Sequence, residues 1–208
     1  FSDQKQRKKS FKDSNLTYSE HIYYKFKSIL KKKLLKHFYQ SVVDKNYDLN
    51  KPYIFCALHY QPEKTTSPLG GDFDDQFYML SLLSESLPKG WLLYVKDHPS
   101  QFVSSYTRYG EHFRSMNFYK KILELPNIRL LPLESDTFHL IDNSKAVASV
   151  TGTSSWEAVV RGVPSFVFGH CWFKHCKGVF YVDSYKCVKN VIDKIIKTTN
   201  INFKFVDL

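Results

Sequence analysis

The sequence predicts an α/β domain in which a Rossmann-like, doubly wound parallel sheet is covered by helices on both faces. Apolar strand-like runs alternate with helical patterns from Lys51 onward, as in βαβ units. Runs such as YIFCAL (53–58) and SFVFG (165–169) are apolar on consecutive residues, which is typical of strands buried on both faces. With 208 residues, 43% of them hydrophobic, the chain is long enough for one such domain and an extension.

The extension comes first and is basic. Residues 1–50 hold 12 Lys and Arg against 5 Asp and Glu, whereas residues 51–208 hold 18 against 15. We therefore divide the chain into a basic arm and helix, 1–50, and the α/β domain, 51–208. Because the α/β domain is close to neutral, a nucleic-acid partner is not expected; binding to nucleic acid would depend on the arm alone.

Residues 1–16 are polar and aperiodic, and an amphipathic helix is expected from Thr17, with Ser19 as its cap. Its apolar residues recur at spacings of three and four, and lysines occupy much of the remaining surface. Two interpretations are open: the stripe packs on the domain, as surface helices do, or the helix lies on an anionic membrane. The stripe consists of Ile22, Phe26, Ile29, Leu30, Leu34 and Phe38.

The α/β domain contains six predicted strands and five predicted helices, with a loop rich in Thr, Ser, Pro and Gly at 65–72. Apolar runs bounded by polar residues predict strands at 53–58, 91–95, 128–131, 146–150, 164–168 and 178–182. Helical spacing of apolar residues predicts helices at 74–87, 111–123, 135–143, 156–161 and 185–198.

Unusual polar clusters follow four of the predicted strands. HYQPE follows the first strand, KDHPS the second, TGTSSWE the fourth and FGHCW the fifth. In doubly wound sheets, ligands bind at the carboxyl ends of the strands, near the point where the strand order reverses. The sequence therefore predicts a ligand site built from these loops.

The turn TGTSSWE has the composition of an anion site. Gly152 allows the backbone to approach a ligand closely. Thr153, Ser154 or Ser155 could cap the following helix, and the N–H groups at a helix start bind phosphate. Glu157 could favour the helix dipole or bind a sugar hydroxyl. A capped helix without a ligand would have the same sequence. The candidate ligand-binding residues of this segment are Thr151, Gly152, Thr153, Ser154, Ser155 and Glu157.

The second strand ends at Lys96, and His98 follows in the loop. A histidine there could donate to a phosphate or act as a general acid, or it could simply be a loop residue in water. Pro99 restricts His98 to extended backbone and so fixes where its ring points. Lys96 is a further candidate for phosphate binding.

Four carboxylates near the end of the first strand could serve glycosyl transfer, which needs a base or nucleophile of this type. Glu63 and Asp72 are the candidates for that role. Asp74 and Asp75 could do no more than start a helix.

Metal and serine-hydrolase sites are not expected. The spacing of Cys171, His175 and Cys176 matches no standard zinc pattern, and no Gly-x-Ser-x-Gly elbow is present. We expect no cofactor. Four cysteines are too few for a disulfide framework, which indicates a reducing, cytoplasmic setting. The sequence shows no secretory signal or membrane span, and without an initiator Met we expect it to be a fragment.

Three segments together resemble the bacterial capsule polysaccharide biosynthesis proteins. They are YIFCALHYQPEKTTSPLGG, WLLYVKDHPSQ and LPNIRLLPLESDTFHLIDNSKAVASVTGTSSWEAVVRGVPSFVFG, which span about residues 52–182. The resemblance is specific at HYQPE, K-x-HPSQ and TGT-x-x-WEA. That family includes transferases that use CMP-activated Kdo, and it implies a GT-B glycosyltransferase. The present chain would be the C-terminal, donor-binding half.

The resemblance also implies roles for single residues. His98 and Pro99, with the turn Thr153 to Ser155, would contact the donor phosphate, and Glu157 would lie near the nucleotide. The partners would be a nucleotide-sugar donor and a saccharide acceptor, with the basic helix on the inner membrane as an option. Since GT-B enzymes need two Rossmann-like domains, the acceptor half would be elsewhere. The alternative is a non-catalytic nucleotide-binding or assembly module of a capsule-synthesis complex.

Overall fold

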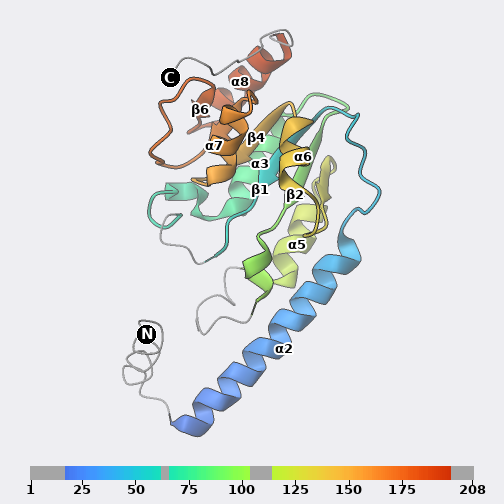
Figure 1. Ribbon diagram of the computed structural model, residues 1–208, viewed down its shortest axis with the longest axis vertical. Coiled ribbons are helices and arrows are strands. Elements are labelled where there is room, and N and C mark those ends of the chain that lie inside the picture. Colours follow the sequence, from blue (N-terminus) through green and yellow to red (C-terminus); the bar gives the residue numbers. More distant parts are fainter. Residues whose placement is uncertain (1–16, 62–65, 104–113, 198–208) are drawn as a thin grey trace.

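A computed structural model describes residues 17–61, 66–103 and 114–197, and within them the strands form one parallel sheet (Figure 1). The strand order is β3-β2-β1-β4-β5-β6, and every neighbouring pair is parallel. All six predicted strands are therefore confirmed. They are β1 (Tyr53–Ala57), β2 (Leu92–Lys96), β3 (Ile128–Leu130), β4 (Ala146–Ser149), β5 (Ser165–Val167) and β6 (Val179–Tyr181).

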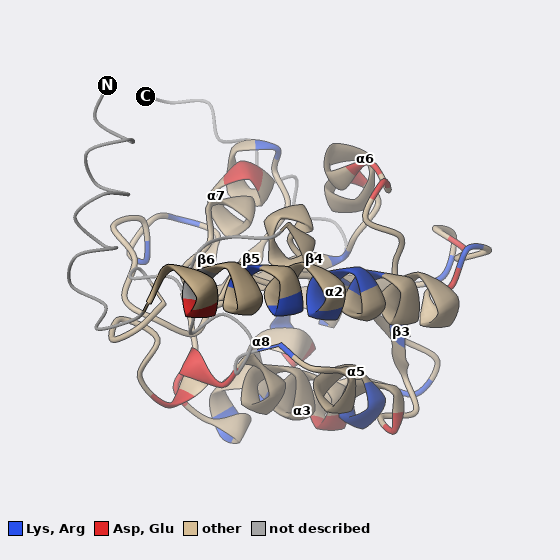
Figure 2. Ribbon diagram, turned by 90° about the horizontal axis from the view of Figure 1, so that it is seen from below, with Lys and Arg blue, Asp and Glu red and all other residues tan. Residues whose placement is uncertain are grey.

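Helices cover both faces of the sheet, which confirms the doubly wound class. Figure 2 shows α6 (Thr137–Asp142) and α7 (Thr153–Val160) on one face, with α3 (Gln76–Ser86), α5 (Met116–Leu123) and α8 (Tyr185–Lys197) on the other. The strand order reverses between β1 and β4, which pair along Ile54 to Cys56. A doubly wound sheet binds its ligands at this reversal, beyond the strand carboxyl ends.

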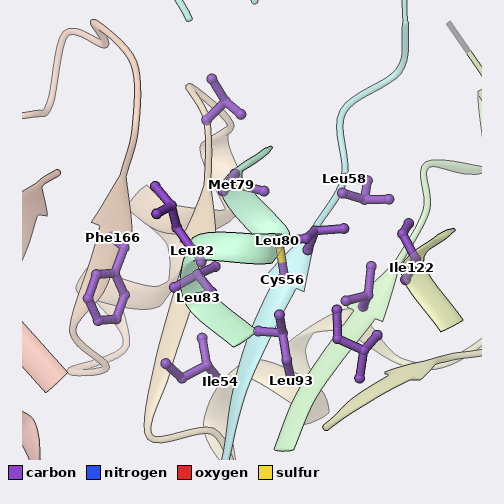
Figure 3. Close-up of a cluster of buried hydrophobic side chains, with 14 of the residues drawn as sticks. Ile54, Cys56, Leu58, Met79, Leu80, Leu82, Leu83, Leu93, Ile122 and Phe166 are labelled. Atoms are coloured by element: carbon purple, nitrogen blue, oxygen red, sulfur yellow. The ribbon is translucent and has the colours of Figure 1, made fainter. Parts of the chain in front are cut away.

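The larger apolar core lies between the sheet and the α3, α5 and α8 face. Figure 3 shows Leu80 and Leu83 of α3 packed over Ile54 and Cys56 of β1, with Leu93 of β2 beside them. All five are fully buried. Since each such leucine or isoleucine stabilises the fold by about 1.5–3 kcal/mol, this layer holds the central strands rigidly in place. The smaller core on the other face includes Phe55, Tyr94, Val147, Leu140 and Ala158.

Several helix starts differ from their predicted positions because a different residue provides the cap. Helix α2 (Tyr18–Val42) starts after Thr17, which forms a capping box with Glu20, so Ser19 is not the cap. Helix α5 starts at Met116 after Ser115, so the predicted start at 111 is too early; residues 111–113 lie outside the described part.

The helix after β4 starts earlier than predicted. Helix α7 begins at Thr153 rather than Trp156, and its N-cap is Gly152, which makes no side-chain hydrogen bond. The expected hydroxyl cap from Thr153, Ser154 or Ser155 is therefore wrong, since all three residues lie within the helix. In the loop after β1, a short 3-10 helix, η1 (Gly71–Asp74), precedes α3, and Asp75 caps α3 through the Phe77 amide.

The predicted apolar stripe of α2 mostly faces solvent. Ile22, Phe26, Leu30 and Leu34 are 46–63% exposed, whereas the buried side chains of the helix are Lys32, Leu35 and Tyr39. The prediction that the stripe packs on the domain is therefore wrong for these four residues. The C-terminal part of α2 packs on α5 and η2 (Pro99–Phe102), and the N-terminal half extends away from the body (Figure 1).

Candidate functional site

The polar clusters found in the sequence do meet at one edge of the sheet. The carboxyl ends of β1, β2 and β4 are neighbours, because β1 pairs with both other strands. The loops that follow them contain His59 and Tyr60, then Asp97 and His98, then the turn from Val150 to Gly152. This edge lies at the reversal of strand order, where the fold class places ligands.

The start of α7 presents unpaired amide groups at this edge. Since Gly152 has no side chain to cap the helix, the amides of Thr153 and Ser154 donate to no group in the described part of the chain. Thr153 is exposed and Ser154 is partly exposed, so a ligand can reach both. Two free N–H groups at the positive end of an eight-residue helix form an anion-binding arrangement.

The hydroxyl of Ser155 has a different role from those of its neighbours. Ser155 is fully buried, and its Oγ lies 2.7 Å from Oγ of Ser149 and donates to the Phe166 carbonyl at 3.2 Å. It therefore ties the helix start to β4 and β5 and is not open to a ligand. Glu157 accepts a hydrogen bond from the Thr153 hydroxyl at 3.3 Å, and both face the outer side of the turn.

His98 lies on the neighbouring loop and is exposed. It is the N-cap of η2, and its Nδ1 accepts the Ser100 amide at 3.2 Å, while Pro99 opens η2. In the neutral ring the proton therefore resides on Nε2, which is a hydrogen-bond donor. The ring of Tyr60 lies 6.5 Å from that of His98, centroid to centroid. His98 thus presents a fixed N–H donor at the same edge as the α7 amides.

The buried side chain of His59 holds the turn after β4 through hydrogen bonds to its backbone. Its Nε2 accepts the amides of Val150 and Thr151 at 3.2 and 3.3 Å, and the side chain is buried. A Cβ at position 152 would lie 2.8 Å from Cε1 of this ring. Gly152 is therefore required where the turn approaches His59 closely, and the two residues together set the path of the backbone into α7.

A buried polar network connects His59 to the end of β2. The Asp97 carboxylate accepts Nε of Arg114 at 2.9 Å, the hydroxyl of Tyr119 at 2.6 Å and the His98 amide at 2.7 Å. Nη2 of Arg114 donates to the His59 carbonyl and to Oε1 of Gln76, both at 3.1 Å.

The members of this network are buried and pair with one another. Oε1 of Gln76 also accepts the His59 amide at 2.9 Å, and each member of the network is at most 8% exposed. Burial raises the pKa of Tyr119 well above its usual value, and the charge of Asp97 adds to that shift. Hydrogen bonds therefore run continuously from the His98 backbone to the Thr151 backbone, so that the two loops hold a set distance.

Sequence reasoning missed most of this network. Arg114, Gln76 and Tyr119 belong to helices or helix starts and carry no motif, so nothing in their local sequence marks them. His59 and Asp97 lie inside the clusters HYQPE and KDHPS, but only the tertiary structure shows that both point inward.

Lys96 lies at the end of β2 but points to the face covered by α6. Its Nζ donates to the Ser135 carbonyl at 2.6 Å and to Oγ1 of Thr137 at 2.9 Å. Burial lowers its pKa, although the charges of Asp136 and Glu134 oppose the shift. The structure thus places Lys96 beneath the start of α6, apart from the amides of α7.

Of the two carboxylates predicted to act as base or nucleophile, the structure describes only one. Asp72 is exposed on η1, and Glu63 lies outside the described residues. Of the two acids expected to start a helix, Asp75 caps α3, while Oδ1 of Asp74 is buried and has no hydrogen-bond partner among the described residues.

All four cysteines are free thiols. Within the described ranges, no three His, Cys, Asp or Glu side chains gather as metal ligands would. Among the helices that the structure describes, none combines the length and the apolar character needed to cross a membrane.

Comparison with known proteins agrees with the resemblance seen in the sequence. The profile of the family described as "capsule polysaccharide biosynthesis protein" matches residues 6–188, which includes α2 as well as the sheet. No match was found among curated protein sequences.

Two solved structures share the fold. KpsC from Thermosulfurimonas dismutans, described as a beta Kdo 2,7 transferase, is 12% identical with a TM-score of 0.51, and the match covers 78% of this chain and 51% of that one. HepE from Anabaena, solved with UDP and glucose, is 14% identical with a TM-score of 0.51, covering 74% and 41%. The chain thus spans about half the length of these GT-B proteins, and at such low identity the likeness concerns the fold.

Proposed function

The chain belongs to the capsule polysaccharide biosynthesis protein family, and we propose that it is the donor-binding half of a glycosyltransferase that uses a CMP-activated sugar such as CMP-Kdo. The observation that carries the proposal is that the free amides of Thr153 and Ser154 and the Nε2 donor of His98 follow strands β4 and β2, which flank β1 at the same edge of the sheet. The buried network behind them makes this arrangement of donors rigid before any ligand arrives.

In this proposal the donor phosphate binds between the α7 amides and His98. Negative charge grows on the phosphate as CMP leaves the sugar, and donors that are already oriented stabilise it without reorganising. Thr151, Gly152 and Ser155 shape the turn, Pro99 fixes the His98 backbone, and Glu157 lies near the nucleotide. Lys96 donates its hydrogen bonds to the loop before α6, so in this proposal it acts on the phosphate through its charge and not through a hydrogen bond.

The acceptor hydroxyl or the anomeric carbon requires a carboxylate. Glu63 and Asp72 keep this role in the proposal, since both follow β1 in the sequence and Asp72 is exposed on η1. The acceptor is a saccharide, and the second Rossmann-like domain of the GT-B fold would present it.

The nucleotide specificity is the first point to test. Calorimetry with CMP, UDP and GDP on the full chain should show the tightest binding for CMP, and His98→Ala should weaken it about tenfold or more, the factor that one lost charged hydrogen bond produces. His37→Ala, an exposed histidine on α2, is the matched control. Equal CMP affinity in the wild type and His98→Ala would contradict the assigned role, and a preference for UDP would contradict the donor class.

A non-catalytic nucleotide-binding or assembly module is the second candidate. It is compatible with the free amides at the start of α7, which would bind a nucleotide phosphate whether or not transfer follows. A module of this kind would bind CMP without hydrolysing a CMP-sugar, even when the rest of its complex is supplied. Release of CMP from CMP-Kdo by the chain, measured by chromatography, would exclude it.

We also propose that α2 rests on an anionic lipid surface. Ile22, Phe26, Leu30 and Leu34 form an outward apolar stripe at intervals of four residues, which places them on one side of the helix. Exposed lysines accompany this stripe and match anionic headgroups, whereas a second copy of the helix would bring like charges together. These lysines are Lys25, Lys27, Lys31, Lys33 and Lys36.

Vesicle sedimentation tests the lipid proposal. The chain should sediment with vesicles of phosphatidylcholine and phosphatidylglycerol but not with phosphatidylcholine alone. Replacing Phe26, Leu30 and Leu34 by Ser should abolish sedimentation while CMP affinity is kept. Sedimentation unchanged by the triple replacement, or dimerisation through α2 in light scattering, would contradict the proposal.

A further inference from the structure

The buried face of α2 reaches the loop that carries His98. The buried side chains that the structure describes in this helix are Lys32, Leu35 and Tyr39, which recur at the spacing of one helical face. This face packs on α5 and on η2, the 3-10 helix that His98 caps (Figure 1). The exposed stripe that we assign to a lipid surface lies on another side of the same helix.

Lys32 differs from the other lysines of α2. Five of the six lysines between residues 25 and 36 are exposed, whereas Lys32 is 6% exposed. Its Nζ donates to the carbonyl of Gln101 at 2.6 Å. An ammonium group that loses its hydration on burial must regain hydrogen bonds from fixed acceptors. Lys32 is therefore committed to η2 and not to the solvated surface of the helix.

Tyr39 holds the other end of the same loop. Its hydroxyl accepts the Asp97 amide at 3.2 Å and donates to the Leu131 carbonyl at 2.7 Å. Its ring packs on Phe102, with the two ring centroids 5.0 Å apart. One side chain of α2 therefore connects the residues that follow β2 and β3 with η2.

Together these two side chains of α2 hold the backbone on either side of His98. Asp97 precedes the histidine and Gln101 follows it by three residues. Between them the Ser100 amide donates to Nδ1 of His98, and the Gln101 amide donates to the His98 carbonyl. The Gln101 side chain also ties η2 to the loop after β1, through the Gln61 amide and carbonyl at 2.8 and 3.3 Å. The direction in which Nε2 of His98 points thus depends on contacts made by α2.

We propose that α2 is part of the donor site and that Lys32 and Tyr39 are positioning residues for His98. They act through the backbone from which the imidazole donates, and not through contact with the ligand. A group already held in its binding orientation loses less conformational freedom when the ligand binds, so loosening the loop weakens binding. The inference rests on the proposed function for the identity of the ligand. The N-terminal helix then contributes to a site that a division at residue 50 assigns to the α/β domain alone.

Two measurements on Lys32→Met in the full chain test the positioning role. The substitution keeps a long side chain and removes the ammonium group, and Lys33→Met at the exposed neighbour is the matched control for the lost charge. Hydrogen exchange at the Gln101 amide, followed by NMR, should become about tenfold faster or more, because a charged hydrogen bond that fixes η2 is lost. The Kd of CMP in calorimetry should rise about threefold or more. Lys33→Met should change neither quantity.

A combined variant separates positioning from a general loss of structure. In His98→Ala no imidazole is left to orient, so adding Lys32→Met should leave the Kd of CMP within about twofold of that of His98→Ala alone. A general structural defect would weaken binding further in that background. Tyr39→Phe, which removes only the hydroxyl, should speed exchange at the same amide, and it repeats the test if Lys32→Met fails to fold in circular dichroism.

The outcomes keep this inference apart from the proposed function. Faster exchange at Gln101, together with a loss of CMP affinity that requires His98, supports the positioning role. Unchanged exchange in both α2 variants overturns the inference. So does an unaltered Kd of CMP in both variants of a chain whose binding depends on His98, and the proposed function then stands. A chain that binds no CMP contradicts the proposed function itself, and the positioning role falls with it.

Discussion

The network around Asp97 and the N-terminal half of α2 are opposites. The network buries charged and polar side chains and satisfies them with one another, from Arg114 through Gln76 to His59. The exposed half of α2 places Ile22, Phe26 and Leu30 in solvent with nothing packed on them in the described structure. Both arrangements cost stability in the isolated chain, since burying charge and exposing large apolar groups are each unfavourable.

The two regions differ in which groups offset this cost in free energy. The network is complete within the chain, so it serves geometry: it fixes the spacing between the His98 loop and the α7 start. The stripe of α2 has no apolar partner among the described residues, which is why we propose an external contact for it. Substitutions in the network should therefore change the free energy of unfolding, whereas substitutions in the α2 stripe should change binding to a partner surface.

The largest expected effect comes from breaking the network. Arg114→Ala leaves the buried Asp97 carboxylate without its charge partner and should lower the free energy of unfolding by about 3–5 kcal/mol. Urea denaturation followed by circular dichroism measures this. Arg129→Ala removes an exposed arginine and should change stability by less than about 0.5 kcal/mol. Equal effects of the two substitutions would mean that the network does not hold the fold.

Two adjacent leucines of α2 test the comparison within one helix. Leu35 is 6% exposed and Leu34 is 57% exposed. Leu35→Ala should lower the free energy of unfolding by about 2–5 kcal/mol through the cavity it leaves. Leu34→Ala should change it by less than about 0.5 kcal/mol and should instead weaken vesicle binding. The reverse pattern in urea denaturation would show that the buried face of α2 is misassigned.

Gly152→Ala tests the contact between the network and the α7 turn. The backbone at 152 has φ −74°, which alanine accepts, so the strain arises only from the Cβ against His59 at 2.8 Å. A loss of about 1–3 kcal/mol is expected. Replacing His59 by Ala in the same chain should remove the clash, so that the two substitutions are not additive in denaturation. Additive losses would contradict the direct contact.

The smallest effect is expected from an exposed ion pair away from both regions. Hydrogen bonds from Arg161 lower the pKa of Asp142. A carboxylate with a lowered pKa in the folded state adds stability above its unfolded-state pKa of about 3.9, and this is lost as pH falls through the folded-state pKa. Asp142→Asn should therefore reduce the loss of melting temperature between neutral and acidic pH. Because exposed pairs contribute little, the reduction should be slight. A larger effect than that of Gly152→Ala would reverse the ranking.

Much of the fold was predictable from the sequence because local pattern carries the information. Consecutive apolar residues in YIFCAL or SFVFG indicate strands covered on both faces, and all six strands form as predicted. Helix starts were less predictable, since several residues near each start can serve as a cap. At α7 the cap is Gly152 rather than a hydroxyl, because the helix already begins at Thr153 and the three candidate hydroxyl residues lie within it.

The face of α2 could not be predicted from its spacing. Ile22, Phe26, Leu30 and Leu34 give a helical stripe, but Leu35 and Tyr39 form a second one, and a periodic pattern does not say which one the domain covers. Contacts with distant parts of the chain bury Tyr39: its hydroxyl donates to the Leu131 carbonyl, and its ring packs on Phe102 and Tyr119.

The sequence alone determined the α/β class, the six strands and the loops that form the candidate site, because each depends on residues close together in the chain. Only the tertiary structure decided that His59 turns inward to hold the Val150 and Thr151 amides, and that Arg114 joins it to Asp97. These residues are 55, 17 and about 90 positions apart in their pairs. Hydrogen bonds across such separations exist only once strands pair and helices pack, so no local pattern encodes them.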